Sequence, residues 1–143
     1  MVAAAAFGTA GFSVVIVDPA PPVTDAHRDG ADLRTTAFLQ PAQAFLETAG
    51  VWSHLADHAT PLQIMRIVDA AASPHVMRDF DASDISDQPF GWNLPNWLLR
   101  REIVARLKDL PNVDFRPGTG FAGMVPRLNA ALVNLTDGTQ VAA

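Results

Sequence analysis

The segment Phe12-Ser-Val-Val-Ile-Val-Asp18-Pro19 decides the fold class of this chain. A short β-branched run without polar alternation is typical of a strand that is buried on both faces, and the proline after Asp18 ends it. The preceding residues 2–10 are rich in alanine, which favours a helix, and Gly11 suits the left-handed position that follows a helix. A helix that leads into a buried strand with an acidic end predicts an α/β unit.

Outward from this unit, the sequence predicts further helices and strands. Apolar residues recur at helical spacing from Ala37 to Ala49, Gly50 follows them, and a short helix is predicted over 52–58. The clearest amphipathic helix covers 97–110, with Asn96 as its N-cap. Its predicted buried face contains Leu99, Ile103, Leu107 and Leu110. Strands are predicted over 62–68, 113–115, 123–125, 128–135 and 139–142. Loops are predicted over 23–35 and 73–89, and the second loop contains a short strand over 76–80.

Composition limits the class of protein. The chain has 143 residues, 49% of them hydrophobic, which is enough for one folded domain. Ten basic and 15 acidic residues give a net charge of −5, which argues against a nucleic-acid partner. The absence of cysteine excludes disulfides and thiolate metal sites, and His54 and His58 lack a third ligand nearby, so no metal is predicted. Without a spanning segment or a signal peptide, we expect a cytoplasmic location.

Both ends suggest a fragment. In a dinucleotide-binding βαβ unit, the acidic residue that ends the second strand follows a glycine-rich turn by about 20 residues. Counting that far back from Asp18 passes Met1, and the final predicted strand runs to Ala143. We therefore expect the phosphate-binding strand and turn to precede this sequence.

Four stretches together resemble a known family. They are Val14-Val-Ile-Val-Asp18-Pro, then Asp32-Leu-Arg34-Thr-Thr-Ala37 with Gly50-Val-Trp52, then Asn93-Leu-Pro-Asn96, and lastly Leu99-Arg100-Arg-Glu-Ile103-Val-Ala-Arg-Leu107 with Val113-Asp-Phe115. Their order resembles the FAD-dependent aromatic hydroxylases (class A flavoprotein monooxygenases), and within them the ubiquinone-biosynthesis hydroxylases. The resemblance implies an α/β fold. Residues 1–143 would then be an incomplete, Rossmann-like FAD-binding domain, in which about 62–93 begin the substrate-binding sheet.

The resemblance also indicates three cofactor-binding residues. An acidic residue at the end of such a strand accepts the ribose hydroxyls of an adenosine, which we expect of Asp18; the alternative is a carboxylate that forms the turn before proline. Arg34 is able to donate a fork of hydrogen bonds to the ribityl or diphosphate oxygens of FAD, unless it pairs with Asp29 or Asp32 at the surface. Arg100 is expected to reach FAD from the other side, and its alternative is a solvated helix face.

Trp92 and Trp97 are expected to contact the substrate by lining an apolar pocket. The alternative is that both tryptophans pack in the core or against a sheet. No catalytic side chain is predicted, because flavin hydroxylases leave the chemistry to the cofactor. The resemblance implies that NAD(P)H reduces FAD and that an oxygen atom is transferred to a phenolic ring, here a polyprenylated ubiquinone precursor. Such a substrate favours peripheral contact with a membrane or with a partner complex, and a homo-oligomer is a further expectation.

Two alternatives stay open from the sequence. One is a nicotinamide-dependent Rossmann oxidoreductase, which uses the same acidic residue. The other is a truncated, non-catalytic domain that self-associates through exposed apolar edges. We expect the 143-residue chain by itself to bind little or no FAD and to be inactive.

Overall fold

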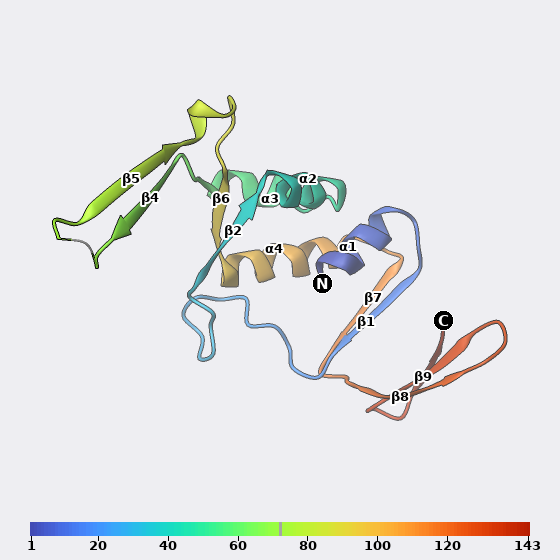
Figure 1. Ribbon diagram of the computed structural model, residues 1–143. Coiled ribbons are helices and arrows are strands. Elements are labelled where there is room, and N and C mark those ends of the chain that lie inside the picture. Colours follow the sequence, from blue (N-terminus) through green and yellow to red (C-terminus); the bar gives the residue numbers. More distant parts are fainter. Residues whose placement is uncertain (72) are drawn as a thin grey trace.

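The computed structural model describes residues 1–71 and 73–143, in which small β-sheets flank a central group of helices (Figure 1). Helix α1 (Val2–Thr9) leads into strand β1 (Val14–Asp18), as the sequence predicts. Gly11 lies between them with φ +92°, a left-handed conformation that glycine adopts without strain. Strand β1 pairs in parallel with β7 (Val113–Pro117). This pair is the α/β part of the fold.

The expectation that β1 is buried on both faces is wrong. Val14 and Ile16 pack against the core, but Val15 on the opposite face is 41% exposed. The sheet contains β1 and β7 alone among the described residues, and α1 contacts this pair. One face of β1 is therefore covered and the other is open.

Residues 37–39, which the sequence predicts as the start of a helix, belong to a strand of a second sheet. Strand β2 (Thr35–Leu39) pairs antiparallel with β6 (Gly91–Pro95), which also pairs with β3 (Thr60–Pro61). The prediction of helix from residue 37 is thus wrong for Ala37, Phe38 and Leu39. Phe38 lies opposite Trp92 across the two strands, a partner too distant in sequence for local periodicity to reveal.

The helices enclose the main hydrophobic core. Besides α1, they are α2 (Gln40–Thr48), α3 (Trp52–Leu55), the short 3₁₀ helix η1 (Ala56–His58) and α4 (Asn96–Lys108). The larger side chains of the buried core cluster are Leu46, Val51, Leu55, Leu94, Leu98, Ile103 and Leu107. Helix α4 confirms the predicted amphipathic helix, although it buries Leu98 more deeply than Leu99.

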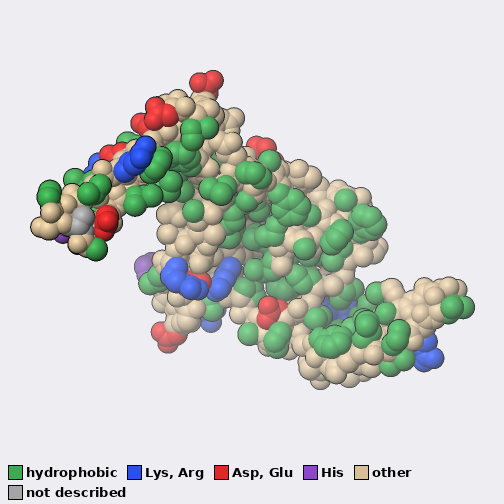
Figure 2. Space-filling view, in the orientation of Figure 1, with side chains coloured by type: hydrophobic (Ala, Val, Ile, Leu, Met, Phe, Trp, Pro, Cys, Tyr) green, Lys and Arg blue, Asp and Glu red, His purple; other side chains and the backbone are tan. Residues whose placement is uncertain are grey.

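Two further sheets lie outside this core. Strands β4 (Ile64–Asp69) and β5 (Val76–Asp81) form a hairpin that projects from the body, and the 3₁₀ helix η2 (Ala82–Asp84) follows it (Figure 1). Figure 2 shows hydrophobic side chains along this hairpin at the surface. Among the described residues, no helix is long and apolar enough to span a membrane.

The C-terminal sheet is antiparallel. It contains β8 (Phe121–Pro126), β9 (Ala131–Leu135) and β10 (Gln140–Ala142) in the order β10-β9-β8. Asp137-Gly138 forms the turn between β9 and β10, as predicted, and Gly138 has φ +84°.

Candidate functional site

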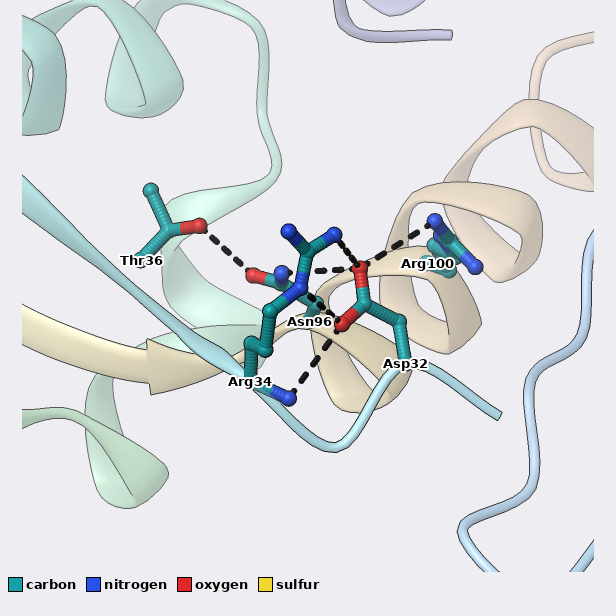
Figure 3. A network of polar contacts seen from close by, with 5 residues as sticks. All are labelled: Asp32, Arg34, Thr36, Asn96 and Arg100. Atoms are coloured by element: carbon teal, nitrogen blue, oxygen red, sulfur yellow. Dashed lines mark hydrogen bonds and ion pairs between the residues drawn. The ribbon is translucent and has the colours of Figure 1, made fainter. Parts of the chain in front are cut away.

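A network of polar side chains joins the loop before β2 to the first turns of α4 (Figure 3). Asp32 is at its centre. Arg34 donates from Nε to Asp32 Oδ1 and from Nη2 to Oδ2, each at 2.8 Å, and Arg100 Nη2 lies 3.5 Å from Oδ2. Figure 3 shows the two guanidinium groups on either side of the carboxylate. The structure therefore brings together both arginines that the sequence predicts as cofactor ligands.

The backbone places these residues side by side. In the β2–β6 ladder Thr35 lies opposite Pro95, so the residue before β2 meets the start of α4. The main-chain nitrogen of Asn96 accordingly donates to the carbonyl oxygen of Arg34 at 2.9 Å. Sheet pairing between distant segments thus creates the site.

Asn96 belongs to the network and is not a helix cap. Pro95 occupies the N-cap position of α4, so the prediction for Asn96 is wrong. Its side-chain nitrogen donates to Asp32 Oδ2 at 3.0 Å, while its oxygen accepts a 2.6 Å hydrogen bond from Thr36 Oγ1. From the sequence, Asp32 is expected only as a surface partner of Arg34, and Thr36 has no predicted role. Their positions in the Asp32-Leu-Arg34-Thr-Thr36 motif, on either side of Arg34, are the sequence signal that could have indicated these roles.

The charges of the network are fixed at neutral pH. Hydrogen bonds from Arg34 first, and from Asn96 second, hold the pKa of Asp32 well below its usual range. The same bond raises the pKa of Arg34 above its usual value. Asp32, Arg34 and Arg100 together therefore carry a net charge of about +1.

Arg34 keeps donor groups free for a ligand. A guanidinium has five N–H groups, and Arg34 directs those of Nε and one of Nη2 at Asp32. Its side chain is 83% exposed and that of Arg100 is 36% exposed. Within residues 1–71 and 73–143, the other side-chain N–H groups of Arg34 have no protein acceptor. Guanidinium forks of this kind bind phosphate or carboxylate oxygens in pairs.

Asp18 lies at the carboxyl end of β1, away from this network. Its Oδ1 accepts a hydrogen bond from the main-chain nitrogen of Ala20 at 3.0 Å, which is the turn-forming arrangement that the sequence left as an alternative. The side chain is exposed, and none of the contacts in the described part of the chain links it to Arg34 or Arg100. The ribose-binding role of Asp18 stays a prediction.

The two predicted substrate tryptophans have different surroundings. Trp92 packs edge-to-face against Trp52, with ring centroids 5.4 Å apart. The guanidinium of Arg101 lies over the ring of Trp97 at 5.3 Å. Both tryptophans are half-buried, and the structure places each beside a different partner. Their role toward a substrate stays a prediction.

Two hollows of the surface lie away from the arginine network. One of about 470 Å³ is lined mainly by valines and alanines of β1, β7, β9 and β10, and another of about 450 Å³ lies between Pro21, Pro22 and α4. Neither includes Arg34 or Arg100. The arginine network lies outside both hollows, and its accessibility rests on the exposure of Arg34 and Arg100. In the described residues, no three His, Asp or Glu side chains are grouped closely enough to hold a metal ion.

Comparisons with known proteins place this geometry in context. No protein-family model matches the chain. The chain is 30% identical over 140 residues to the ubiquinone hydroxylase UbiL of Rhodospirillum rubrum, covering 98% of this chain and 32% of that protein. The chain therefore spans about a third of the length of this curated relative.

Solved structures have the same fold. The chain superposes on p-nitrophenol 4-monooxygenase PnpA from Pseudomonas putida with a TM-score of 0.73 and 17% identity, covering 99% of this chain and 34% of that one. For the flavin-dependent monooxygenase PieE, solved with FAD and substrate, the TM-score is 0.70 at 20% identity, covering 99% and 26%. The α/β, partly Rossmann-like fold class and the resemblance to flavoprotein monooxygenases are confirmed.

Proposed function

We propose that this chain is the part of an FAD-dependent aromatic monooxygenase that holds the diphosphate of the cofactor between Arg34 and Arg100. The observation that carries the proposal is the convergence of these two arginines, from a loop and from α4, on the single carboxylate of Asp32. The side chains of Arg34 and Arg100 are both exposed to solvent, which supports access by a ligand.

The donor set fits the cofactor. FAD carries two linked phosphates, and two guanidinium groups with N–H groups to spare match paired anionic oxygens in charge and geometry. Asp18 ends the first strand of the parallel pair, the position from which a carboxylate accepts ribose hydroxyls. FAD, when bound, supplies the redox and oxygen-transfer chemistry, and these side chains bind and orient it.

The proposed reaction is hydroxylation of a phenolic ring with NAD(P)H as the reductant. The 30% identity to a ubiquinone hydroxylase supports a polyprenylated ubiquinone precursor as the substrate. We place the start of the substrate-binding sheet at about residues 62–93, with Trp92 and Trp97 beside the substrate. A polyprenyl substrate favours peripheral membrane contact, for which the apolar β4–β5 hairpin offers an exposed surface.

A segment exchange tests this proposal. The matching 140 residues of the Rhodospirillum rubrum hydroxylase are replaced by this chain, and the purified protein is examined for flavin absorbance and for hydroxylation. We expect a yellow protein that retains FAD, and loss of flavin when Arg34 and Arg100 are both replaced by alanine.

The matched control is Arg66→Ala, because Arg66 also pairs with an aspartate but lies on the projecting hairpin. A folded, colourless exchange protein contradicts the proposal. Binding of a nicotinamide nucleotide in place of flavin supports the Rossmann oxidoreductase alternative. Circular dichroism establishes that each protein is folded.

A further inference from the structure

We propose that Asp32 is a positioning residue, whose carboxylate holds Arg34 and Arg100 in the arrangement that presents their remaining N–H groups to one anionic ligand. The identification of that anion as the diphosphate of FAD rests on the proposed function. The role of Asp32 itself rests on the contacts that follow.

The carboxylate of Asp32 has no accepting capacity left for a ligand. Its Oδ1 accepts from the main-chain nitrogen of Arg34 at 3.2 Å and from Arg34 Nε at 2.8 Å. Its Oδ2 accepts from Arg34 Nη2 at 2.8 Å and from Asn96 Nδ2 at 3.0 Å, with Arg100 nearby. A carboxylate offers about four lone-pair sites, and these contacts use them. Asp32 therefore acts through the arginines and does not touch the ligand itself.

Asp32 is held by several partners, whereas the side chain of Arg34 has Asp32 as its single polar partner in the described part of the chain. The Asp32 side chain is only 11% exposed. Thr36 donates to the oxygen of Asn96, which turns the amide nitrogen of Asn96 toward Asp32. The order of contacts runs from Thr36 through Asn96 to Asp32 and then to both arginines (Figure 3). The exposed arginine thus receives its orientation from a nearly buried anion.

Without this anion the two arginines lose their common anchor. Two guanidinium groups repel each other, and a long exposed arginine samples many rotamers whose freedom is lost on binding. A carboxylate between them offsets the repulsion and fixes one edge of the Arg34 fork before a ligand arrives. Preorganisation of this kind raises affinity by reducing the ordering needed at binding.

Net charge alone predicts the opposite effect on anion binding. Asp32→Asn raises the net charge of the network from about +1 to about +2, which by Coulomb attraction strengthens anion binding. If positioning dominates, the same substitution weakens binding, because the bidentate, charge-assisted anchor of Arg34 is lost. The direction in which Asp32→Asn changes anion affinity therefore shows whether Asp32 acts mainly through its charge or through positioning of the arginines.

The experiment uses the 143-residue chain and inorganic pyrophosphate as the probe. Arginine Nε–H signals are followed by ¹⁵N NMR without ligand and during titration. For Asp32→Asn we expect affinity about tenfold weaker and faster solvent exchange at Arg34 Nε–H, with the backbone spectrum unchanged elsewhere. Asp79→Asn is the matched control, because Asp79 makes the same bidentate pair with Arg66 at 2.7 Å on the hairpin. That control should leave pyrophosphate binding unchanged.

Equal or tighter pyrophosphate binding by Asp32→Asn overturns the inference, as does an unaltered Arg34 signal or a wild-type chain that binds no pyrophosphate. Arg34→Lys keeps the charge but removes the fork. It should weaken binding by a similar factor and add little in the Asp32→Asn background. If Asp32→Asn does not fold, Arg34→Lys alone decides, and unchanged binding overturns the inference.

These results are separable from the proposed function. Failure of the exchanged hydroxylase to retain FAD, together with weakened pyrophosphate binding by Asp32→Asn, removes the flavin assignment and leaves the role of Asp32 intact. Flavin retention by the exchanged hydroxylase, together with unchanged pyrophosphate binding by Asp32→Asn, removes the positioning role of Asp32 and leaves the flavin assignment intact.

Discussion

The side-chain nitrogen of Asn96 lies 3.0 Å from Asp32 Oδ2, so the first residue of α4 and the loop before β2 share one carboxylate. The other end of the same amide accepts from Thr36 on β2. One half-buried amide thus connects a helix, a strand and a loop. Its removal should affect both stability and the arginine pair.

Asn96→Ala should lower the free energy of unfolding by about 1–3 kcal/mol, because Thr36 and Asp32 each lose a partner in a partly buried place. Asn96→Asp should cost more at neutral pH, since it sets a second carboxylate beside that of Asp32. Urea unfolding followed by circular dichroism measures both. A milder effect for aspartate than for alanine contradicts the network as described.

Asp32 should make stability depend on pH. Its pKa is lowered in the folded state by the hydrogen bond from Arg34, so its ionised form stabilises the fold. That contribution is complete above the unfolded pKa of about 4 and is lost as the pH falls toward the folded value. The difference in unfolding free energy between wild type and Asp32→Asn should therefore be largest near neutral pH and shrink below about pH 4.

The same measurement on Asp79→Asn provides the comparison. Arg66 also lowers the pKa of Asp79, but that pair lies on the exposed hairpin, where ion pairs contribute little. We expect a much flatter pH dependence for this control. A constant difference for Asp32→Asn at all pH values counts against its ion pair with Arg34.

Single substitution of Arg34 or Arg100 by alanine should weaken FAD retention in the exchanged hydroxylase by about tenfold or more, the usual effect of removing a charged hydrogen-bond partner. Flavin release during dialysis gives the dissociation constant. Arg66→Ala should retain flavin like the parent protein. Unchanged flavin content in both arginine variants contradicts their assignment.

Gly50→Ala should destabilise the fold more than Gly11→Ala. Both glycines have positive φ, +68° and +92°, so each substitution introduces backbone strain of about 1–2 kcal/mol. A methyl group on Gly50 also meets the guanidinium of Arg106, with Nη2 at 2.8 Å, whereas nothing lies within 4 Å at Gly11. Thermal unfolding of the two variants gives the comparison. Equal losses contradict the close packing of Arg106 on Gly50.

Local signals explain which elements the sequence predicts correctly. Helix α4 follows from apolar spacing within one segment, and the turn at Asp137-Gly138 follows from the two residues that form it. Strand β2 depends instead on β6, more than fifty residues later, and its short run Thr35–Leu39 carries no clear alternation. The helix predicted over Ala37 to Leu39 was wrong because pairing with β6 outweighs local preference.

The two arginines of the candidate site could likewise be predicted from local sequence, whereas their contacts could not. Arg34 and Arg100 are predicted individually by resemblance, because each belongs to a short motif. Their meeting on Asp32 depends on β2–β6 pairing, which no local pattern reports. The N-cap prediction for Asn96 failed for this reason too, since its side chain is engaged by distant partners.

The parallel pairing of Val14 with Val113 has a consequence for the nascent chain. A ribosome adds about 5–20 residues each second, so the residues between these two positions take about 5–20 s to synthesise. During that interval the valine-rich β1 has left the exit tunnel without its partner and is exposed to other polypeptides. We expect a holding chaperone to bind this segment until β7 emerges.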